Sequence, residues 1–414
     1  MRECRVAIVG FGGVGRAVAE MLLSRRERYR QFYRTDVRLV AACGSRSGIS
    51  DRAGLELDRL KSFETGASGP DFIRTSGADL LIEAGPSDFR TGGPGLAYIA
   101  SALSAGNDAI VISKGALVHS GRHLRDLARA SGARLKISGA TAAALPTIDL
   151  LDYALRGCSI LRIEGILNAT TNHLLHAMSS GGMGFAESLA EAQDAGFAES
   201  DLRNDIEGWD TACKVLLLAN FGLDADLTME DVSVEGIQSI SEARIAAWRA
   251  EALVPKLVGR IWYEGGTARA SVGVQALDQA DPLAHVTDNN KAIRITTDFM
   301  GDVVAMGEDR GRPPRRQRPS RISNIFSRIV SWRLSGKTDR YQQGHSAEAS
   351  GFAGGLEAGR NYAHDLVRRA AGGLVRVAAK GGRGRRSLRS RNRTHLGNDR
   401  VGKKADGQLY GAVQ

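Results

Sequence analysis

Short apolar runs alternate with helical patterns over the first 140 residues of the chain. Apolar runs bounded by turn residues predict buried strands, and apolar positions spaced three or four residues apart predict helices. Strands alternating with helices in this way are typical of a parallel, doubly wound α/β sheet. The predicted strands cover 5–9, 37–42, 79–84, 109–113 and 134–138, and the predicted helices cover 16–24, 96–105 and 119–131.

The pattern changes after Pro146 to one typical of a more antiparallel, α+β unit. Strand-like alternation becomes more frequent there, and the helical stretches lie farther apart. The predicted strands cover 159–167, 232–237, 258–263, 268–274 and 292–297, with a strand pair in 298–306, and the predicted helices cover 150–155, 185–195 and 209–221.

Charge separates the last quarter of the chain from the rest. The 414 residues have a net charge of +10, but residues 308–414 contain 24 Lys and Arg against 8 Asp and Glu, a net +16. Residues 1–307 therefore contain 32 basic and 38 acidic side chains, a net −6. The last segment is rich in Arg, Gly and Pro and has too few periodic apolar residues to bury a core.

These patterns together predict the domain organisation. We expect a folded body and an irregular basic tail, which is either disordered or an aberrant C-terminus such as a shifted reading frame would produce. The expected parts are a doubly wound α/β domain over 1–140, a second, α+β domain over 141–297, a short segment over 298–307 and the tail over 308–414.

The composition excludes several classes of protein. With 43% hydrophobic and 25% charged residues it is ordinary for a globular protein, and no apolar run approaches the roughly 18–20 residues of a membrane span. The four cysteines form no CxxC pair, which argues against a zinc site or a disulfide framework. Without a signal-peptide pattern we expect a cytoplasmic protein, and nucleic acid as a partner only if the basic tail is genuine.

A glycine-rich GxGxxG segment lies between the first predicted strand and the first predicted helix, which is the context of a dinucleotide-binding loop. The first glycine permits the tight turn, the second lets the backbone approach a pyrophosphate, and the third lets the helix pack on the strand. Free N–H groups at the helix start attract the anion. The alternative is a glycine-rich turn of another α/β fold. We assign Gly10, Gly12, Gly13, Val14 and Gly15 to the cofactor site.

The end of the second predicted strand bears on the cofactor type. NAD-binding sites usually have an acid there, bonded to the ribose, but the segment 43–47 contains none. Arg46, flanked by two serines, could bind a 2′-phosphate through charge-assisted hydrogen bonds, so we expect NADP(H). If Arg46 is only a solvated loop residue, NAD(H) is also accepted. We also assign Ser87 to the cofactor site.

Acidic residues and a lysine gather in the segment 196–214, GFAESDLRNDIEGWDTACK. Asp210 and Lys214 are four residues apart on a predicted helix and therefore share a face. The carboxylate would keep the lysine charged, and a positioned ammonium can donate a proton to a carbonyl oxygen as hydride reaches its carbon. Glu199 could accept hydrogen bonds from a substrate ammonium group. The alternative is a surface ion pair of about 0.3–0.5 kcal/mol.

A second lysine, Lys114, directly follows the predicted strand 109–113. It therefore belongs to the carboxyl edge of the sheet, where ligands bind in open α/β folds. We assign it to the catalytic and cofactor sites, with a solvent-facing loop lysine as the alternative.

Taken together, these segments resemble the homoserine dehydrogenase family over about residues 3–307. The resemblance implies reduction of L-aspartate 4-semialdehyde to L-homoserine with NAD(P)H, on the route to threonine and methionine. It also implies that 1–140 is a Rossmann-type NAD(P)-binding domain, and that 141–297 is a substrate-binding and dimerisation domain through which a homodimer forms. The segment 298–307 is then expected to return toward the nucleotide domain. The matching segments are the glycine loop, VISKGAL at 111–117, SGATAAALPTI at 138–148, GILNATTNHLL at 165–175 and the acidic block at 196–214.

The resemblance also implies roles for individual residues. It makes Lys214 the proton donor, Asp210 its partner and Lys114 the lysine at the junction of cofactor and substrate. Glu199, Asp205 and Thr170 match residues that contact the small-molecule substrate. A structural site for a monovalent cation such as Na⁺ is implied at the backbone carbonyls of Ser138, Thr141, Ala143 and Leu145.

The chain departs from the family pattern in places. Ala169 replaces the more usual glycine, Ser138 stands where an acid is common, and the family's closing helix near residue 320 is not apparent. We expect no fused aspartate kinase. The alternatives to a homoserine dehydrogenase are another small amino-acid semialdehyde dehydrogenase and a catalytically weak NADP-binding protein with a nucleic-acid-binding tail.

Overall fold

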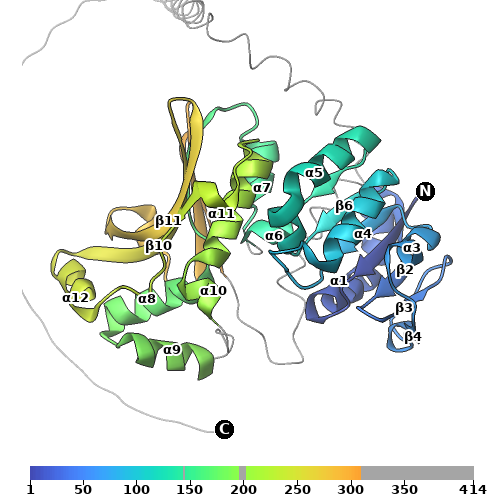
Figure 1. Ribbon diagram of the computed structural model, residues 1–414, viewed down its shortest axis with the longest axis horizontal. Helices are drawn as coiled ribbons and strands as arrows, with labels where there is room; N and C mark the ends of the chain where they lie inside the picture. The colour runs from blue at the N-terminus through green and yellow to red at the C-terminus, as the bar shows by residue number, and fades with distance from the viewer. Residues whose placement is uncertain (143–144, 195–201, 309–414) are drawn as a thin grey trace, which may run out of the picture. The chain divides into compact units, whose positions relative to one another are not determined.

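The computed structural model describes residues 1–142, 145–194 and 202–308 of the chain. These residues form two β-sheets with helices packed against them (Figure 1). The predicted α/β fold, with a Rossmann-type parallel sheet and a second α+β part, is confirmed. The predicted tail lies outside the described residues except for Glu308, so its predicted irregular structure stays a prediction.

The first sheet has the strand order β4-β3-β2-β1-β5-β6-β7 in the described residues. Strands β2, β1, β5, β6 and β7 are parallel to one another, while β3 pairs antiparallel with β2, and β4 antiparallel with β3, at one edge. The strands are β1 (Arg2–Val9), β2 (Thr35–Cys43), β3 (Ser47–Ser50), β4 (Glu64–Thr65), β5 (Leu80–Glu83), β6 (Asp108–Val111) and β7 (Leu135–Lys136).

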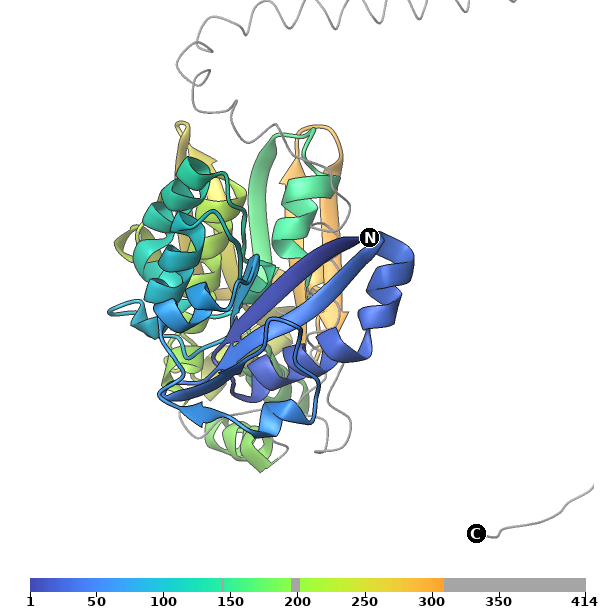
Figure 2. The ribbon, with the colours of Figure 1, turned by 90° about the vertical axis from the view of Figure 1, so that its right-hand side faces the viewer.

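Helices cover both faces of this sheet, because its central strands are apolar on both sides. In β1, Val6 and Ile8 pack on the side of α1, while Ala7 and Val9 pack on the side of α4 and α5. Figure 2 shows the strands between these two groups of helices. The helices are α1 (Gly13–Ser24), α2 (Arg26–Tyr33), α3 (Pro70–Thr75), α4 (Gly93–Ser104) and α5 (Gly115–Ser131).

The second sheet has the order β13-β12-β8-β10-β11-β9 in the described residues. It is antiparallel except for the parallel pair of β9 and β11, as the change of pattern after Pro146 predicts. The strands are β8 (Ile160–Ile166), β9 (Val232–Val234), β10 (Leu253–Glu264), β11 (Thr267–Asp278), β12 (Asn290–Thr297) and β13 (Gly301–Glu308).

Apolar side chains on one face of the second sheet pack against the helices of this part. In the described ranges, no helix is long and apolar enough to span a membrane. The helices are α6 (Ser138–Ala142), α7 (Thr147–Asp149), α8 (Ala169–Gly181), α9 (Phe185–Asp194), α10 (Arg203–Ile206), α11 (Trp209–Gly222) and α12 (Glu242–Ala250).

The segment 298–307 corrects one expectation. It does not return toward the nucleotide domain, because β13 pairs with β12 along its whole length, from Asn290 opposite Glu308 to Thr297 opposite Gly301. Gly301 has a φ of +66° and is the first residue of β13, directly after the turn at 298–300. The segment therefore completes the second sheet as its edge strand.

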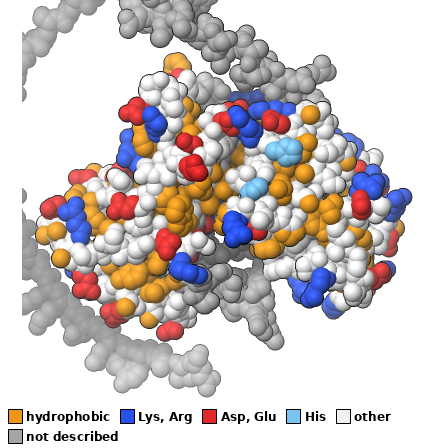
Figure 3. All heavy atoms as spheres, viewed as in Figure 1, with side chains coloured by type: hydrophobic (Ala, Val, Ile, Leu, Met, Phe, Trp, Pro, Cys, Tyr) orange, Lys and Arg blue, Asp and Glu red, His pale blue; other side chains and the backbone are white. Residues whose placement is uncertain are grey.

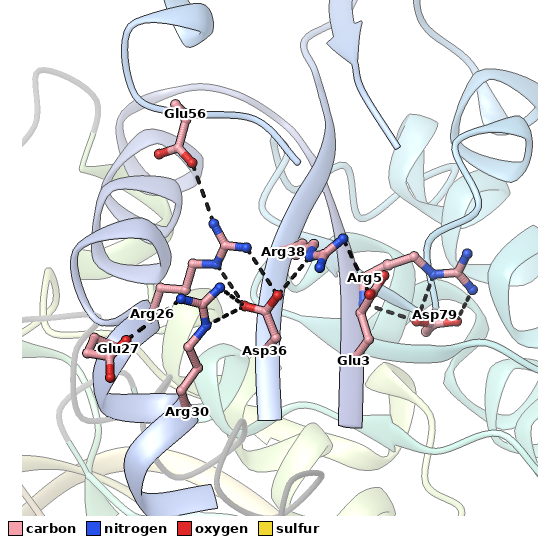
Figure 4. A network of polar contacts seen from close by, with 9 residues as sticks. All are labelled: Glu3, Arg5, Arg26, Glu27, Arg30, Asp36, Arg38, Glu56 and Asp79. Carbon is pink, nitrogen blue, oxygen red and sulfur yellow. Dashed lines mark hydrogen bonds and ion pairs between the residues drawn. The ribbon is translucent and has the colours of Figure 1, made fainter. Parts of the chain in front are cut away.

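A network of charged side chains connects α2 to the amino end of β2, at the end of the strands opposite the glycine loop (Figure 4). The carboxylate of Asp36 accepts hydrogen bonds from Arg26, Arg30 and Arg38 at 2.8–3.1 Å, and its side chain is only 10% exposed. Hydrogen bonds from these three arginines outweigh partial burial, so the pKa of Asp36 lies well below its usual range. The charged form of Asp36 therefore stabilises the contact between α2 and β2.

We expect the substitution Asp36→Asn to destabilise the protein by about 2 kcal/mol at pH 7, because hydrogen bonds to charged groups contribute roughly 1.5–3 kcal/mol. The folded-state pKa of Asp36 is lowered, so its contribution is present above the unfolded pKa of about 4 and is lost as the pH falls below it. Denaturant unfolding of both proteins between pH 7 and pH 3 should show the difference shrinking. Asp71→Asn, in an exposed ion pair with Arg74, is the control and should change stability by less than about 0.5 kcal/mol.

Candidate active site

The glycine loop joins β1 to α1, and its glycines differ in what surrounds them. Gly10 has a φ of +82°, and a Cβ there would lie 2.3 Å from the backbone nitrogen of Gly85. A Cβ on Gly15 would lie 2.3 Å from the carbonyl oxygen of Gly10. By contrast, a Cβ on Gly12 or on Gly13 would meet nothing within 4 Å. Gly10 and Gly15 are therefore packed tightly against backbone, whereas Gly12 and Gly13 face open space at the start of α1. An anionic group has room there to meet the free N–H groups of the helix.

Other predicted cofactor residues lie around this loop. Val14 is 42% exposed in the first turn of α1. The N–H of Gly10 donates to the carbonyl of Cys43 at 3.0 Å, which places the loop beside the end of β2. Arg46 lies just beyond that end and is exposed, and no carboxylate of the described residues pairs with it. The structure thus leaves the guanidinium available to a ligand at this edge.

Ser87 and Lys114 come together at the carboxyl edge of the sheet. The hydroxyl oxygen of Ser87 accepts a hydrogen bond from the backbone N–H of Lys114 at 2.9 Å. Lys114 immediately precedes α5, and its ammonium lies 3.5 Å from a carboxylate oxygen of Asp210. This ion pair connects the first sheet's edge to α11 of the second part.

The acidic cluster is centred on Asp210, in the first turn of α11. Its second carboxylate oxygen accepts a hydrogen bond from the ammonium of Lys214 one turn later. Lys214 also donates to the carbonyl of Leu167 at 2.7 Å, and its side chain is 10% exposed. Asp210 and Lys214 are therefore mostly buried and directed toward Lys114, unlike a surface ion pair.

The charge state of Asp210 follows from these neighbours. Burial by itself would raise its pKa, but Lys214, Lys114 and a hydrogen bond from Asn168 outweigh burial and hold the pKa of Asp210 well below its usual range. The carboxylate is therefore ionised at neutral pH. Beneath it, burial raises the pKa of the Cys213 thiol to about 12, so this cysteine is a neutral packing residue.

The pKa of Asp205, in α10, is shifted in the opposite direction. Burial and the nearby charge of Asp210 raise its pKa, although hydrogen bonds from Asn168 and Thr170 oppose the change. The structure thus brings Asp205 and Thr170 together with Lys114, Asp210 and Lys214, which we call the lysine cluster. Glu199 lies outside the described residues.

Asn168 is a residue of this cluster that the sequence analysis does not single out. Its side-chain amide donates to Asp205 at 2.7 Å and to Asp210 at 2.8 Å, while its carbonyl oxygen accepts from the N–H of Thr171 at 3.0 Å. It is therefore the N-cap of α8 and a bridge between the two acids. An Asn before a helix is a recognisable capping signal, but the bridge spans about 40 residues of sequence and has no local signature.

Glu83, at the end of β5, is a second such residue. Its fully buried carboxylate accepts hydrogen bonds from Ser113 at 2.6 Å and from the N–H of Gly85 at 2.7 Å. Burial raises the pKa of Glu83. Glu83 therefore connects Gly85, in the loop that lies against Gly10, to Ser113, the residue before Lys114.

The predicted cation site is described only in part. Ala143 lies outside the described residues, and the carbonyl of Ser138 accepts a hydrogen bond from the Thr141 hydroxyl at 3.1 Å. Leu145 is buried, and its N–H donates to the carbonyl of Ala142 at 2.9 Å. The described residues contain no group of three or more His, Cys, Asp or Glu placed to bind a metal, and the monovalent site stays a prediction.

We expect Asn168→Ala to destabilise the protein by about 2–3 kcal/mol, because it removes a helix cap worth about 1 kcal/mol and donors to two buried acids. Asn168→Ser keeps a capping oxygen but no amide donor, so it should recover about 1 kcal/mol of that loss. Thermal and denaturant unfolding measure both. Equal stability of the alanine and wild-type proteins would contradict the bridging role.

Comparison with known proteins adds to this geometry. The family model described as "Homoserine dehydrogenase, NAD binding domain" matches residues 10–138, and the model described as "Homoserine dehydrogenase" matches residues 146–315. The second match thus ends eight residues beyond Gly307, near the change of charge.

Two relatives and one solved structure are similar over most of the body. The NAD(+)-dependent homoserine dehydrogenase of Pseudomonas canavaninivorans is 33% identical over 327 residues, covering 75% of this chain and 93% of the relative. The homoserine dehydrogenase of Methanocaldococcus jannaschii is 32% identical over 319 residues, covering 74% and 93%. A crystal structure from Archaeoglobus fulgidus, provisionally named a homoserine dehydrogenase, has a TM-score of 0.71 and 29% identity and covers 80% of this chain and all of that one.

Proposed function

Because the chain belongs to the homoserine dehydrogenase family, NAD(P)-dependent oxidoreductases that act on a CH–OH group, we propose that it interconverts L-aspartate 4-semialdehyde and L-homoserine with NADP(H). The observation that carries this proposal is the convergence of two lysines from separate parts of the chain on one ionised carboxylate, Asp210. We further propose that the product serves threonine and methionine biosynthesis.

Gly12 and Gly13 leave the start of α1 open, and the free N–H groups there would hold the pyrophosphate of a dinucleotide. When bound, the cofactor supplies or accepts the hydride. The chain's own residues supply the proton and the charge around the reacting carbonyl.

Lys214 is the proposed proton donor. As the aldehyde carbon gains hydride, its oxygen gains negative charge, which a nearby ammonium stabilises and then neutralises by giving up a proton. Asp210 keeps Lys214 charged and fixes its direction through the hydrogen bond between them. Lys214 returns to the ammonium form by taking a proton from solvent, and in homoserine oxidation each step runs in reverse.

The remaining acids suit the other end of the substrate. L-homoserine and its aldehyde carry an ammonium group, for which carboxylate oxygens are good acceptors. Asp205 lies beside Thr170 in the described site and would contribute to that recognition together with Glu199. The predicted homodimer stays a prediction.

The choice of NADP(H) rests on Arg46. It is exposed at the end of β2, and the residues from Cys43 to Ser47 offer no carboxylate for a ribose hydroxyl. A guanidinium binds phosphate oxygens in paired, charge-assisted hydrogen bonds. The name of the Pseudomonas canavaninivorans relative favours the alternative, NAD(H), so this preference needs a direct test.

Lys214→Ala should lower kcat for homoserine oxidation by about 10²–10⁴-fold, the range for removal of a general acid–base group, with cofactor affinity unchanged. The measurements are reduced-nicotinamide absorbance with homoserine and NADP⁺, and cofactor binding by fluorescence. Lys61→Ala, at an exposed lysine, is the control. A Lys214→Ala enzyme with more than a tenth of wild-type kcat would rule out this role, and a wild-type chain without turnover would overturn the proposed reaction.

Arg46→Ala should raise the Kd for NADP⁺ about tenfold, as expected for loss of one charge-assisted hydrogen bond of roughly 1.5–3 kcal/mol, and leave the Kd for NAD⁺ within twofold. Titration calorimetry with both nucleotides measures this. Arg28→Ala, at an exposed arginine of α2, is the matched control. An equal effect on both nucleotides, or on neither, would favour NAD(H) as the cofactor.

A further inference from the structure

The two helices that carry the lysine cluster belong to separate sheets. Lys114 lies at the N-terminus of α5, which follows β6 of the first sheet, while Asp210 and Lys214 occupy the first two turns of α11, which packs on the second sheet. The 3.5 Å contact between Lys114 and Asp210 therefore depends on how α5 and α11 pack against each other.

At their other ends the same two helices are connected by a group of opposite charges. We call it the arginine–aspartate cluster, and it consists of Arg122, Arg125 and Arg129 of α5 with Asp224 and Asp226 in the loop after α11. Arg125 lies 2.5 Å from Asp224 and 3.6 Å from Asp226, Arg129 lies 3.4 Å from Asp224, and Arg122 pairs with Asp226. Figure 3 shows basic and acidic side chains next to one another over this region. The helices are thus joined at both ends.

Arg125 is the central member of this cluster. Its side chain is only 13% exposed, its guanidinium lies 5.4 Å from the centre of the Phe221 ring, and it donates a hydrogen bond to the carbonyl of Asn220 near the end of α11. Burial lowers the pKa of Arg125, although the charge of Asp224 opposes this change. Its partners are therefore needed to offset the cost of burying the charge.

The loop that presents the aspartates is itself constrained. Asp224 and Asp226 have φ values of +53° and +56°, a conformation that aspartate tolerates better than most residues. The side chain of Asn220 forms two hydrogen bonds of 2.7 Å with the backbone of Leu227, one as donor and one as acceptor. The carboxylates are therefore held in a fixed relation to the end of α11.

A kink in α5 separates its lysine end from its arginine segment. Ser120 has φ −137° and ψ 29°, values outside the helical range. Directly after the kink, the backbone at Gly121 approaches Phe221 so closely that a Cβ would lie 3.1 Å from the ring. At this kink α5 contacts Phe221 of α11, between the end that carries Lys114 and the segment that Arg125 joins to Asp224.

We infer that Arg125 is a positioning residue: by joining α5 to the end of α11, the arginine–aspartate cluster sets the distance between Lys114 and the Asp210–Lys214 pair. This inference rests on the proposed function, in which those three residues act on the substrate. The arginine–aspartate cluster, toward the C-terminal ends of both helices, would therefore affect the rate of the chemical step.

Arg125→Met removes the charge and every donor while keeping an extended side chain, and Asp224→Asn removes the main acceptor. We expect each to lower kcat about tenfold, since misplacement of about 1 Å can cost up to 10² in rate, and to leave cofactor Kd within twofold. Arg125→Lys, which retains the charge, should recover part of kcat. Arg74→Met, at an exposed helical ion pair, is the control and should match the wild type.

Hydrogen–deuterium exchange of the full-length chain gives a readout independent of turnover. Arg125→Met should speed exchange of residues 115–119 and 210–214 relative to both the wild type and Arg74→Met. Asp224→Asn serves the same purpose if Arg125→Met does not fold. Unchanged kcat and unchanged exchange in a folded variant would overturn the inference. Faster exchange together with a wild-type chain that lacks homoserine turnover would overturn the proposed function and leave the positioning role standing.

Discussion

The ionised carboxylate of Asp210, shared by two ammonium groups, is the interaction on which the arrangement of the described site depends. Lys114 reaches it from the edge of the first sheet and Lys214 from its own helix. Neither lysine is well solvated, so without this carboxylate two like charges would face each other in a region where water offers little compensation. The same contact also connects the part of the chain with the glycine loop to the part with the acidic cluster.

The two carboxyl groups that accept hydrogen bonds from one amide have pKa values shifted in opposite directions. Asn168 donates to both Asp205 and Asp210, yet burial raises the pKa of the first while the lysines lower the pKa of the second. Environments that separate the pKa values of neighbouring acids are a common basis for assigning different roles to them. Here the separation leaves one firmly anionic group, Asp210, beside the lysines, and a second carboxyl group, Asp205, with a raised pKa on the other side of Asn168.

Local patterns predicted most of the strands and the carboxyl-edge placement of Lys114, because buried strands and glycine turns have short-range signatures. They missed α8, whose first turn is polar and β-branched, and α12, which follows a capping serine at Ser241. They began α5 four residues late, at His119 instead of Gly115, because Ser120 interrupts the helix with non-helical φ and ψ values just after His119.

Long-range contacts were the least predictable part of the site. Asn168 contacts acids 37 and 42 residues away, and Glu83 contacts Ser113 across 30 residues. The spacing of apolar residues does not indicate such pairs, because they depend on how separate elements pack. The segment 298–307 was misplaced for the same reason: its strand pattern was recognised, but its partner, β12, was not.

The packing under the glycine loop has a consequence for how such an enzyme can change. A Cβ on Gly10 would meet the backbone of Gly85 at 2.3 Å, and a Cβ on Gly15 would meet the backbone of Gly10 at 2.3 Å. No substitution of a neighbouring side chain can relieve these contacts, so the two glycines cannot be replaced without moving the backbone around them. The end of β2 is different, because Ser45 and Arg46 are exposed and support no core residue. Nucleotide preference can therefore drift through substitutions at a few tolerant surface positions, while the part of the fold that accommodates the dinucleotide stays fixed.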